Sequence, residues 1–524
     1  MVQAKISNRV TQYSLIAAFG GFVFGLDAAN ISGAIRYVSS LFELDSIQQG
    51  TVVGVALLGV IVALFFTGPL CEKLGRAKVL LIIGFTYALS SIVSASALNY
   101  EMLVLGRFIG GVAFASITVS AMYIGEIAPP ETRGKFVSVN QFMIGLGLLL
   151  AFVVNYFFIQ SIGSISWLTN ENIWRFMLGA ELIANAVWLV LLWKIPESPR
   201  WLISQGKEDE ARKAYAQIIA GGNVESFITS VKESLNKTTK RPIFEQLKDL
   251  FSSRFKMVVF IAVCYAIVQG ATGMNAVLFF APMVFEQVGM SVEDTFMQTI
   301  VTGLVGLLAT IIAISLVEKL GRRILTLAGL SLVVVAHAST WFGFSQANYV
   351  FNDAAISQIE MQFEVDGIST ETLSSLKGKT FEDDVALKSA IGQVFNKKEL
   401  PLASGTIINA TIQGVNAPLV LFGIFAFLAA FNMSIGPIMW VIFSEVFPNS
   451  VRSVALPFAA LVQTVSSWSI QQFFPWQLDN MGISSIFLIY GGFGLVGLIV
   501  MWFTLPETKG KSIEEIEVML VKES

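Results

Sequence analysis

Long apolar runs separated by short polar stretches fill most of this chain. A helix that crosses a bilayer needs about 20 predominantly apolar residues, and twelve segments meet that requirement. They cover 13–38, 50–70, 79–98, 101–125, 136–158, 172–194, 256–283, 295–317, 324–345, 416–444, 453–475 and 483–505. The pattern therefore predicts an all-α membrane protein with twelve transmembrane helices.

Two longer polar stretches interrupt this pattern and divide the chain. Residues 196–255 join a first bundle (1–195) to a second (256–505), and their amphipathic runs 207–219 and 224–235 predict short cytoplasmic helices. Residues 346–414 form a polar insertion whose scattered apolar positions predict a small packed cap. The flanking spans are complete without it, so we expect the cap to be accessory to function. Residues 506–524 form a polar tail.

The two halves carry the same short signatures in the same order. Glu126 precedes Arg133 by seven residues, and Glu445 precedes Arg452 by seven. A Gly-Arg pair comes earlier in each half, and a Pro-Glu element closes each half, at 196–197 and 506–507. Internal repeats of this kind are typical of transporters whose substrate site lies between two moving halves. The sequence therefore predicts two pseudo-symmetric bundles of six helices.

Composition agrees with a membrane protein and excludes several other classes. Hydrophobic residues make up 54% of the chain and charged residues 14%, well below the roughly 25% charge of soluble proteins. A net charge of −3 gives no reason to expect a nucleic-acid partner. Cys71 and Cys264 do not suggest a disulfide framework, and the lone His337 has no neighbours in the sequence that would complete a metal site. No enzymatic constellation is present.

The distribution of lysine and arginine sets the expected orientation. If both termini are cytoplasmic, eight of the 34 basic residues lie outside or near the outer face, and five of these belong to the insertion. The positive-inside rule therefore predicts a multi-pass protein of the cell membrane with both termini in the cytoplasm. The eight residues are Arg36, Arg107, Arg175, Lys377, Lys379, Lys388, Lys397 and Lys398.

Six motifs, in order and in the right segments, resemble those of a known family. The chain resembles the sugar porters of the major facilitator superfamily, which include proton–sugar symporters and glucose facilitators, over nearly its whole length apart from the insertion. The resemblance implies the major facilitator fold and transport of a sugar. The motifs are GRFIGG (106–111), the Glu126–Gly134 segment, PESPRWL (196–202), GMN (273–275), GPIMW (436–440) and PETKG (506–510).

Asp27 is the most informative single residue because a charge inside a spanning helix is costly unless it is paired or hydrated. Its position in the first span and that of Arg107 in the fourth place both in the outer half of the membrane. We expect the two to pair, either as a fixed structural ion pair or as a titrating one. In proton-coupled sugar porters, the resemblance implies that the matching residues alternate between paired and protonated states. The proton is then the coupling ion, with no other cofactor.

A sugar site needs uncharged hydrogen-bonding groups and an aromatic face for the C–H side of the ring. Six residues match family positions that contact sugar, although amides of this kind also join helices in membranes. They are Phe24, Gln141, Gln269, Asn275, Trp440 and Gln463.

Several positions depart from the family pattern. A tyrosine pair after Asn275 is replaced by phenylalanines, and Leu148, Gly306 and Thr464 occupy positions where relatives often carry Gln, Asn and Trp. The pocket therefore has fewer polar groups, which leaves the identity of the sugar open.

Repeated charges at the predicted cytoplasmic ends suggest a gate. We expect the charges of the two halves to pair when the inner side is closed and to separate when it opens, although exposed pairs are worth only about 0–1 kcal/mol. The candidates are Glu72, Arg76, Glu126, Arg133, Arg200, Glu318, Arg322, Glu445, Arg452 and Glu507.

The sequence thus favours a secondary transporter that imports a monosaccharide, a hexose or a pentose, with a proton by alternating access, working as a monomer in the lipid bilayer. The presence of Asp27 favours symport because facilitators of the family usually lack it. Two alternatives remain open: a passive sugar facilitator, and a transporter-like sugar sensor. Against the sensor, only 19 residues follow the last predicted span, which ends at 505, whereas such sensors usually carry long tails.

Overall fold

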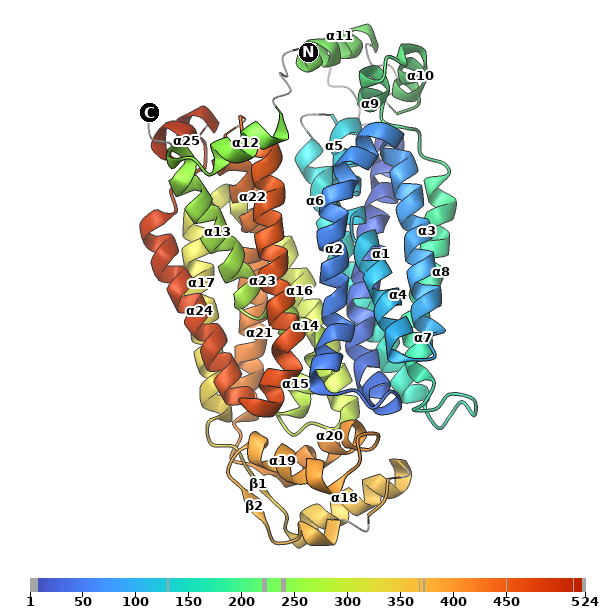
Figure 1. Cartoon of the computed structure of the whole chain (residues 1–524), viewed down its shortest axis with the longest axis vertical. Coiled ribbons are helices and arrows are strands. Elements are labelled where there is room, and N and C mark those ends of the chain that lie inside the picture. Colours follow the sequence, from blue (N-terminus) through green and yellow to red (C-terminus); the bar gives the residue numbers. More distant parts are fainter. Residues whose placement is uncertain are drawn as a thin grey trace.

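The computed structural model describes residues 8–129, 132–218, 224–236, 242–366, 368–370, 373–448, 450–511 and 513–520. Within these residues, twelve helical stretches are long and apolar enough to cross a membrane. Each coincides with one of the twelve segments predicted from the apolar pattern, so the predicted set of spans is confirmed. The spans form two bundles that stand side by side (Figure 1).

The first bundle contains six spans, two of which are interrupted. The fourth span breaks near Ala115 and the sixth near Ala180. The helices are α1 (Asn8–Leu41), α2 (Ser46–Leu74), α3 (Arg76–Ala95), α4 (Tyr100–Ala113), α5 (Ser116–Ile127), α6 (Arg133–Ser161), α7 (Ile173–Gly179) and α8 (Glu181–Leu192).

The second bundle also contains six spans, and two of them, the seventh and the tenth of the chain, are interrupted. At the first break, Gly273 has a φ of 87°, and a Cβ there would lie 2.2 Å from the Tyr490 ring, so only glycine fits. The helices are α13 (Lys256–Ala271), α14 (Met274–Phe279), α15 (Ala281–Glu286), α16 (Val292–Leu320), α17 (Arg322–Phe344), α21 (Ala417–Met433), α22 (Ile435–Val446), α23 (Arg452–Asn480) and α24 (Ile483–Thr504).

Short helices gather at one end of the two bundles, which we call the linker end (Figure 1). Two of them confirm the helices predicted from the amphipathic runs of the connecting segment. The set comprises α9 (Pro199–Ser204), α10 (Glu208–Ile218), α11 (Val224–Asn236), α12 (Ile243–Leu250), the single turn η1 (Ser253–Phe255) and α25 (Ile513–Leu520).

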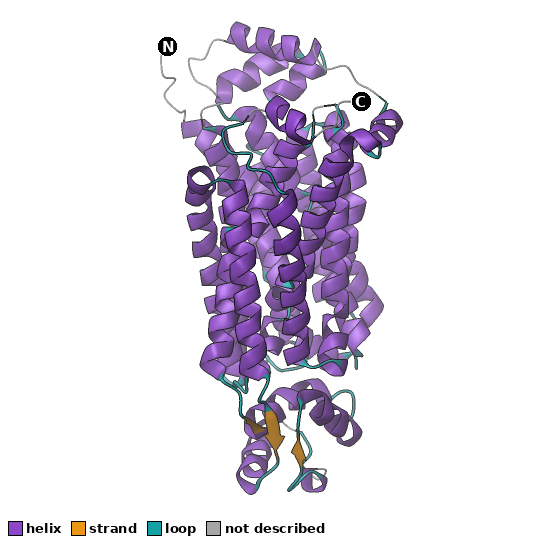
Figure 2. Cartoon of the chain, turned by 90° about the vertical axis from the view of Figure 1, so that its left-hand side faces the viewer, coloured by secondary structure: helices purple, strands orange, loops and turns teal. Residues whose placement is uncertain are grey.

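The insertion lies at the opposite end, which we call the insertion end (Figure 2). It has a hydrophobic core of its own, which includes Tyr349, Phe363 and Ile391, so the prediction of a packed cap is confirmed. Its three strands form an antiparallel sheet in the order β2-β1-β3. The elements are β1 (Asn348–Val350), α18 (Asp353–Asp366), η2 (Leu373–Ser375), β2 (Thr380–Phe381), α19 (Asp384–Val394), α20 (Leu400–Thr411) and β3 (Ile412–Gln413).

The two bundles meet along two pairs of helices, α2 with α23 and α6 with α16. Inside the first bundle, α1 and α6 cross at backbone contact. A Cβ at Gly25 would lie 2.3 Å from the Ile144 carbonyl oxygen, and one at Gly147 would lie 2.2 Å from that of Phe22. This tight crossing fixes the stretch of α1 that carries Asp27.

Candidate functional site

Asp27 and Arg107 form a buried ion pair between α1 and α4. The Arg107 Nη1 lies 2.7 Å from the Asp27 Oδ1 and 3.4 Å from the Asp27 backbone oxygen. The two residues are only 4% and 2% exposed. Within the described residues, Asp27 Oδ2 and Arg107 Nε have no hydrogen-bond partner. The structure thus brings together the two residues that the sequence placed at similar depth.

Small residues make room for this pair. A Cβ at Gly110 would lie 2.6 Å from Ser90 Oγ and 3.4 Å from Asp27 Oδ2. A Cβ at Gly106 would lie 2.4 Å from Ser94 Oγ. The close packing of α3 on α4 therefore depends on both glycines, and it places the Arg107 guanidinium against α1.

A second carboxylate, Glu181, was missed by the sequence reasoning. It begins α8, is 1% exposed, and its Oε1 accepts a hydrogen bond from Ser91. It lies close enough to interact with both Asp27 and Arg107. The signal in the sequence was an acidic residue well inside a predicted span, the same signal that identified Asp27. The buried cluster therefore contains two carboxyl groups and one guanidinium.

The six sugar-site candidates lie on both halves. Gln463 of α23 donates a hydrogen bond from Nε2 to Gln269 Oε1 of α13 at 2.8 Å and to Ser467 Oγ at 2.9 Å. This is the one direct contact among the six that the described residues show. A Cβ at Gly270 would lie 2.6 Å from Ser466 Oγ, so the close approach of α13 and α23 brings the two amides together.

The other four candidates lie on separate elements. Asn275 lies on α14 directly after the break at Gly273, and Trp440 lies on α22. In the first bundle, Phe24 packs edge-on against Phe114 with ring centroids 4.5 Å apart. Gln141 lies on α6, about one turn before Gly145, which packs against Leu307 of α16.

None of the six candidates is buried, and Trp440 is 49% exposed. An amide that faced lipid in mid-membrane would leave its hydrogen-bonding groups unsatisfied, at a cost of several kcal/mol. The exposed amides are therefore best accommodated if they face a hydrated space between the halves. That arrangement presents two N-half and four C-half groups to a substrate.

The charges at the linker end form one cluster in the first bundle. Arg76 Nη2 lies 2.8 Å from Glu126 Oε1, whose other oxygen accepts from Ser198. Glu197 Oε1 accepts the backbone N–H groups of Arg76 at 2.8 Å and Ala77 at 3.1 Å. One carboxylate thus binds the arginine side chain, and the other caps the N-terminus of the helix that the arginine begins.

The second bundle builds the same cluster from matching residues. Arg322 Nη2 lies 2.9 Å from Glu445 Oε1, and Thr508 Oγ1 donates to Glu445 Oε2 at 2.5 Å. Glu507 accepts the backbone N–H groups of Arg322 at 3.0 Å and Arg323 at 3.1 Å. Partial burial alone would raise the pKa of Glu507, but the backbone N–H groups of residues 509, 322, 323 and 508 outweigh it and hold that pKa below its usual value.

The pairing lies within each half, not between halves. In this conformation both described arginine–glutamate pairs of the cluster join helices of one bundle, so the expected pairing across the halves at the linker end stays a prediction. Glu197 was missed as a member, although its repeat mate Glu507 was predicted, and the symmetry itself is the signal that would have found it.

The remaining charges contribute less directly. Glu72 is exposed, and its backbone oxygen accepts from Trp201 Nε1 at 2.8 Å. Arg452 donates from Nη2 to the Phe447 carbonyl at 2.8 Å and closes the turn after α22. Arg200 is exposed on α9. The side chains of Arg133 and Glu318 lie outside the described residues.

Comparison with known proteins decides the family. The family model described as "Sugar (and other) transporter" matches residues 13–356 and 401–520. This chain belongs to that family. It is a sugar porter of the major facilitator superfamily, and such proteins are transporters, not enzymes.

Two curated relatives and one solved structure illustrate how closely this sugar porter resembles others. The D-xylose-proton symporter of Escherichia coli is 30% identical, over 98% of this chain and 96% of its own length. The arabinose-proton symporter of Bacillus subtilis is 28% identical, over 97% and 94%. The inward-open structure of the E. coli xylose transporter XylE superposes with a TM-score of 0.73 at 28% identity, covering 97% of this chain and 99% of that one.

The family match also isolates part of the insertion. Residues 357–400 fall between the two matched stretches of the sugar porter family, and they include α19 and most of α18 and the turn η2. The middle of the insertion therefore lies outside the match to the family model, whereas nearly all of α20 (Leu400–Thr411) lies inside it.

Proposed function

We propose that this protein imports a monosaccharide, a hexose or a pentose, together with a proton, by alternating access between its two halves. The observation that carries the proposal is the buried cluster of Asp27, Arg107 and Glu181. With both carboxyl groups ionised, the cluster would carry a net charge of −1, and binding of one proton would neutralise it. Conformational change is less costly when the cluster in the low-dielectric core is neutral than when it is charged.

The site also links the proton to the sugar. Asp27 lies less than one helical turn after Phe24 on α1, so a change in the Asp27–Arg107 pair moves a residue of the proposed pocket. The relatives named as arabinose- and xylose-proton symporters support sugar and proton as the coupled pair.

We further propose that the linker end faces the cytoplasm and the insertion end faces outside, with the sugar porter in the cell membrane. The excess of lysine and arginine at the linker end supports this orientation. The bundles contact each other at the insertion end, where Gln472 of α23 donates to the Ile47 carbonyl of α2 at 3.0 Å. The similarity to an inward-open transporter supports placing this closed end outside.

The test is a substrate screen in proteoliposomes. Purified protein should accumulate one or more pentoses or hexoses when an inward proton gradient is imposed, and collapsing the gradient should stop accumulation above equilibrium. Uptake that does not depend on the imposed proton gradient would establish a passive facilitator. Specific sugar binding without any flux would establish a sensor.

A further inference from the structure

The insertion is anchored to the second bundle, from which the chain enters and leaves it. Asp384 Oδ2 accepts the backbone N–H of Ile483 at 3.1 Å, and Lys388 donates from Nζ to the Leu478 carbonyl at 2.8 Å. Both contacts hold α19 against the turn between α23 and α24. The insertion is therefore expected to move with the second bundle.

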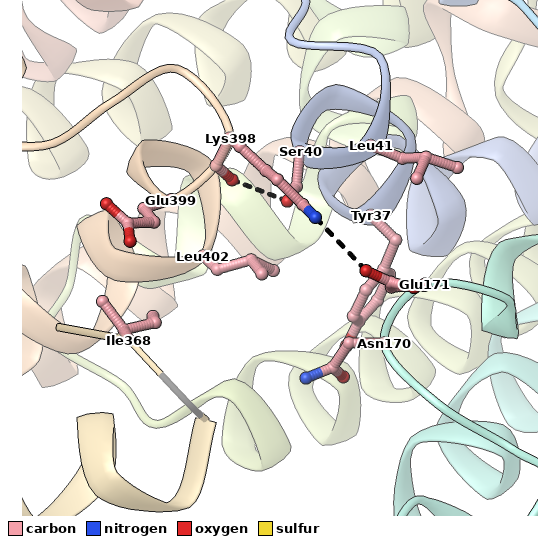
Figure 3. A pocket seen from close by; sticks show the side chains of 9 residues that line it. All are labelled: Tyr37, Ser40, Leu41, Asn170, Glu171, Ile368, Lys398, Glu399 and Leu402. Carbon is pink, nitrogen blue, oxygen red and sulfur yellow. Dashed lines mark hydrogen bonds and ion pairs between the residues drawn. The ribbon is translucent and has the colours of Figure 1, made fainter.

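It also binds the first bundle. Ser40 of α1 donates from Oγ to the Lys398 carbonyl at 2.6 Å, and the Lys398 Nζ lies 3.2 Å from Glu171 Oε1, in the loop between α6 and α7. Figure 3 shows these contacts at the rim of a cavity of about 260 Å³ between the insertion and the first bundle. Arg36 of α1 adds a third contact, from Nη2 to the Leu402 carbonyl at 2.6 Å.

Arg36 joins all three parts of the molecule. Its Nη1 lies 2.6 Å from Glu286 Oε1 at the end of α15, in the second bundle. The side chains are only 10% and 9% exposed. A Cβ at Gly405 of α20 would lie 3.0 Å from Glu286 Cδ and 3.3 Å from Arg36 Nη1. Helix α20 thus covers the ion pair and shields it from water, which strengthens the attraction between the charges.

These contacts cannot survive separation of the bundles at the insertion end. Arg36 and Ser40 move with α1, and Glu286 follows Asn275 on the broken seventh span of the other bundle. Opening this end would expose the Arg36–Glu286 pair and break its bond to α20. The exposed Lys398–Glu171 pair adds little strength, so the covered pair dominates.

We propose that α20 and the Arg36–Glu286 pair form a latch that stabilises the state closed at the insertion end. This proposal depends on the proposed function only because it assumes that the two bundles move by alternating access. Its release is a step in opening the sugar site to the outside, and the insertion sets how readily that step occurs. This revises the expectation that the insertion is merely accessory.

The first test measures the conformation without sugar. Spin labels are attached at Leu98→Cys and Ser345→Cys, which are both exposed and lie at the insertion end of opposite bundles. Double electron–electron resonance then measures the distance between the bundles. Cys71 and Cys264 are replaced by Ala in this background. Glu286→Gln should add a longer distance, with the outward-open population rising by about tenfold or more, the effect expected from loss of one charge-assisted hydrogen bond.

The matched control is Lys377→Met, which removes an ion pair to Asp353 inside the insertion (2.7 Å). It should leave the distance distribution unchanged. The Arg36→Met/Glu286→Met double variant, which leaves no buried charge unpaired, should lengthen the distance as Glu286→Gln does. An unchanged distribution in folded Glu286→Gln, or equal lengthening in Lys377→Met, overturns the proposal. This distance measurement does not require transport, so its result can be distinguished from a failure of the proposed function.

The second test asks whether the contact must break during turnover. Glu171→Cys/Lys398→Cys, in the cysteine-free background, should be joined by a short reducible bis-methanethiosulfonate cross-linker and lose uptake, and reduction should restore it. The pair Asp353→Cys/Lys377→Cys, which lies wholly within the insertion, should cross-link without effect. Wild-type uptake by fully cross-linked Glu171→Cys/Lys398→Cys protein would overturn the latch.

Discussion

At the scale of the residue, the buried cluster of Asp27, Arg107 and Glu181 is under competing demands. The Arg107 guanidinium pairs with Asp27 and lies near Glu181, and one oxygen of each carboxyl has no partner among the described residues. A group left unpaired in a low-dielectric site is costly. The unpartnered oxygens leave the cluster able to rearrange, as the proposed alternation between two states requires.

Asp27→Asn tests the coupling role. The amide keeps the shape of the carboxyl group but has no titratable proton and no charge to pair with Arg107. We expect loss of proton-driven accumulation, while sugar binding and counterflow exchange stay largely intact. Parallel uptake and exchange measurements in proteoliposomes would show this split. Full accumulation by the variant would rule out Asp27 as the coupling group, and Asp353→Asn on the exposed insertion is the control.

Pocket truncations test the sugar site. Gln269→Ala, Asn275→Ala and Trp440→Ala should each weaken sugar binding. Loss of one amide hydrogen bond costs about 0.5–1.5 kcal/mol, or roughly 2- to 12-fold in affinity, and loss of Trp440 removes an aromatic face for the sugar ring. Removing Gln269 also takes away one of the two hydrogen-bond partners of the Gln463 amide. Calorimetric titration of each purified variant would measure the change. Wild-type affinity in all three would mean that the sugar binds elsewhere.

At the scale of the element, the two clusters at the linker end show how a tight turn is fixed by a distant carboxylate. Gly75 and Gly321 separate consecutive spans with φ values of 92° and 88°. A Cβ there would lie 2.3 Å from Glu197 Oε2 and 2.6 Å from Glu507 Oε2. The glycine, the arginine after it and the carboxylate form one unit, repeated in both halves.

Gly75→Ala and Gly321→Ala should each be destabilising, by about 1–3 kcal/mol, because the backbone conformation and the space both exclude a side chain. Thermal unfolding in detergent should show a lower midpoint for each. Gly68→Ala is the matched control, since nothing lies within 4 Å of a Cβ at that position of α2. A midpoint equal to that of the control would contradict this account of the turn.

The capping role of Glu507 predicts a pH dependence. Its lowered pKa means that the folded state favours the ionised carboxylate, so this stabilisation is present above the usual glutamate pKa of about 4.3 and is lost as pH falls through the lower folded value. Wild-type protein should therefore lose stability over this acidic range more steeply than Glu507→Gln. Unfolding midpoints measured across that range would check it, and parallel curves would contradict it.

The spans could be predicted from sequence because lipid demands long apolar helices, whatever their neighbours. The depth argument for Asp27 and Arg107 succeeded for the same reason. Glu181 was missed although its position inside the predicted span 172–194 carried the same signal as Asp27. The Arg36–Glu286 pair was not found, because its significance depends on which helices pack together. Glu286 lies just after the predicted span 256–283 and looks like a helix boundary. Arg36 looks like one more charge near the outer face until α15 and α20 are placed beside it.

At the scale of the whole molecule, closure at the insertion end involves three bodies, not two. The bundles touch directly through α2 and α23, where Gln471 donates to the Val53 carbonyl at 3.1 Å. The insertion then spans the same boundary from outside. Its separate hydrophobic core lets it act as a rigid piece, so a few bonds to α1 transmit its position to the first bundle.

Replacing residues 351–411 by a short Gly/Ser turn between β1 and β3 tests the role of the insertion in closing the insertion end. The bundles should still fold, because the core of the insertion is separate, and uptake should persist. The outward-open share should rise, because α20 no longer covers the Arg36–Glu286 pair. Size-exclusion chromatography, uptake and spin-label distances would report these outcomes. A folded deletion protein that binds sugar but cannot move it would make the insertion an essential gate.

The register of β1 and β3 has a practical consequence. Asn348 pairs with Gln413 and Tyr349 with Ile412, so the chain leaves and rejoins the second bundle at a single point. Any foreign domain whose ends lie close together could be grafted onto that two-strand stem without stretching α17 or α21. A fluorescent protein mounted there would be carried by the second bundle at the insertion end.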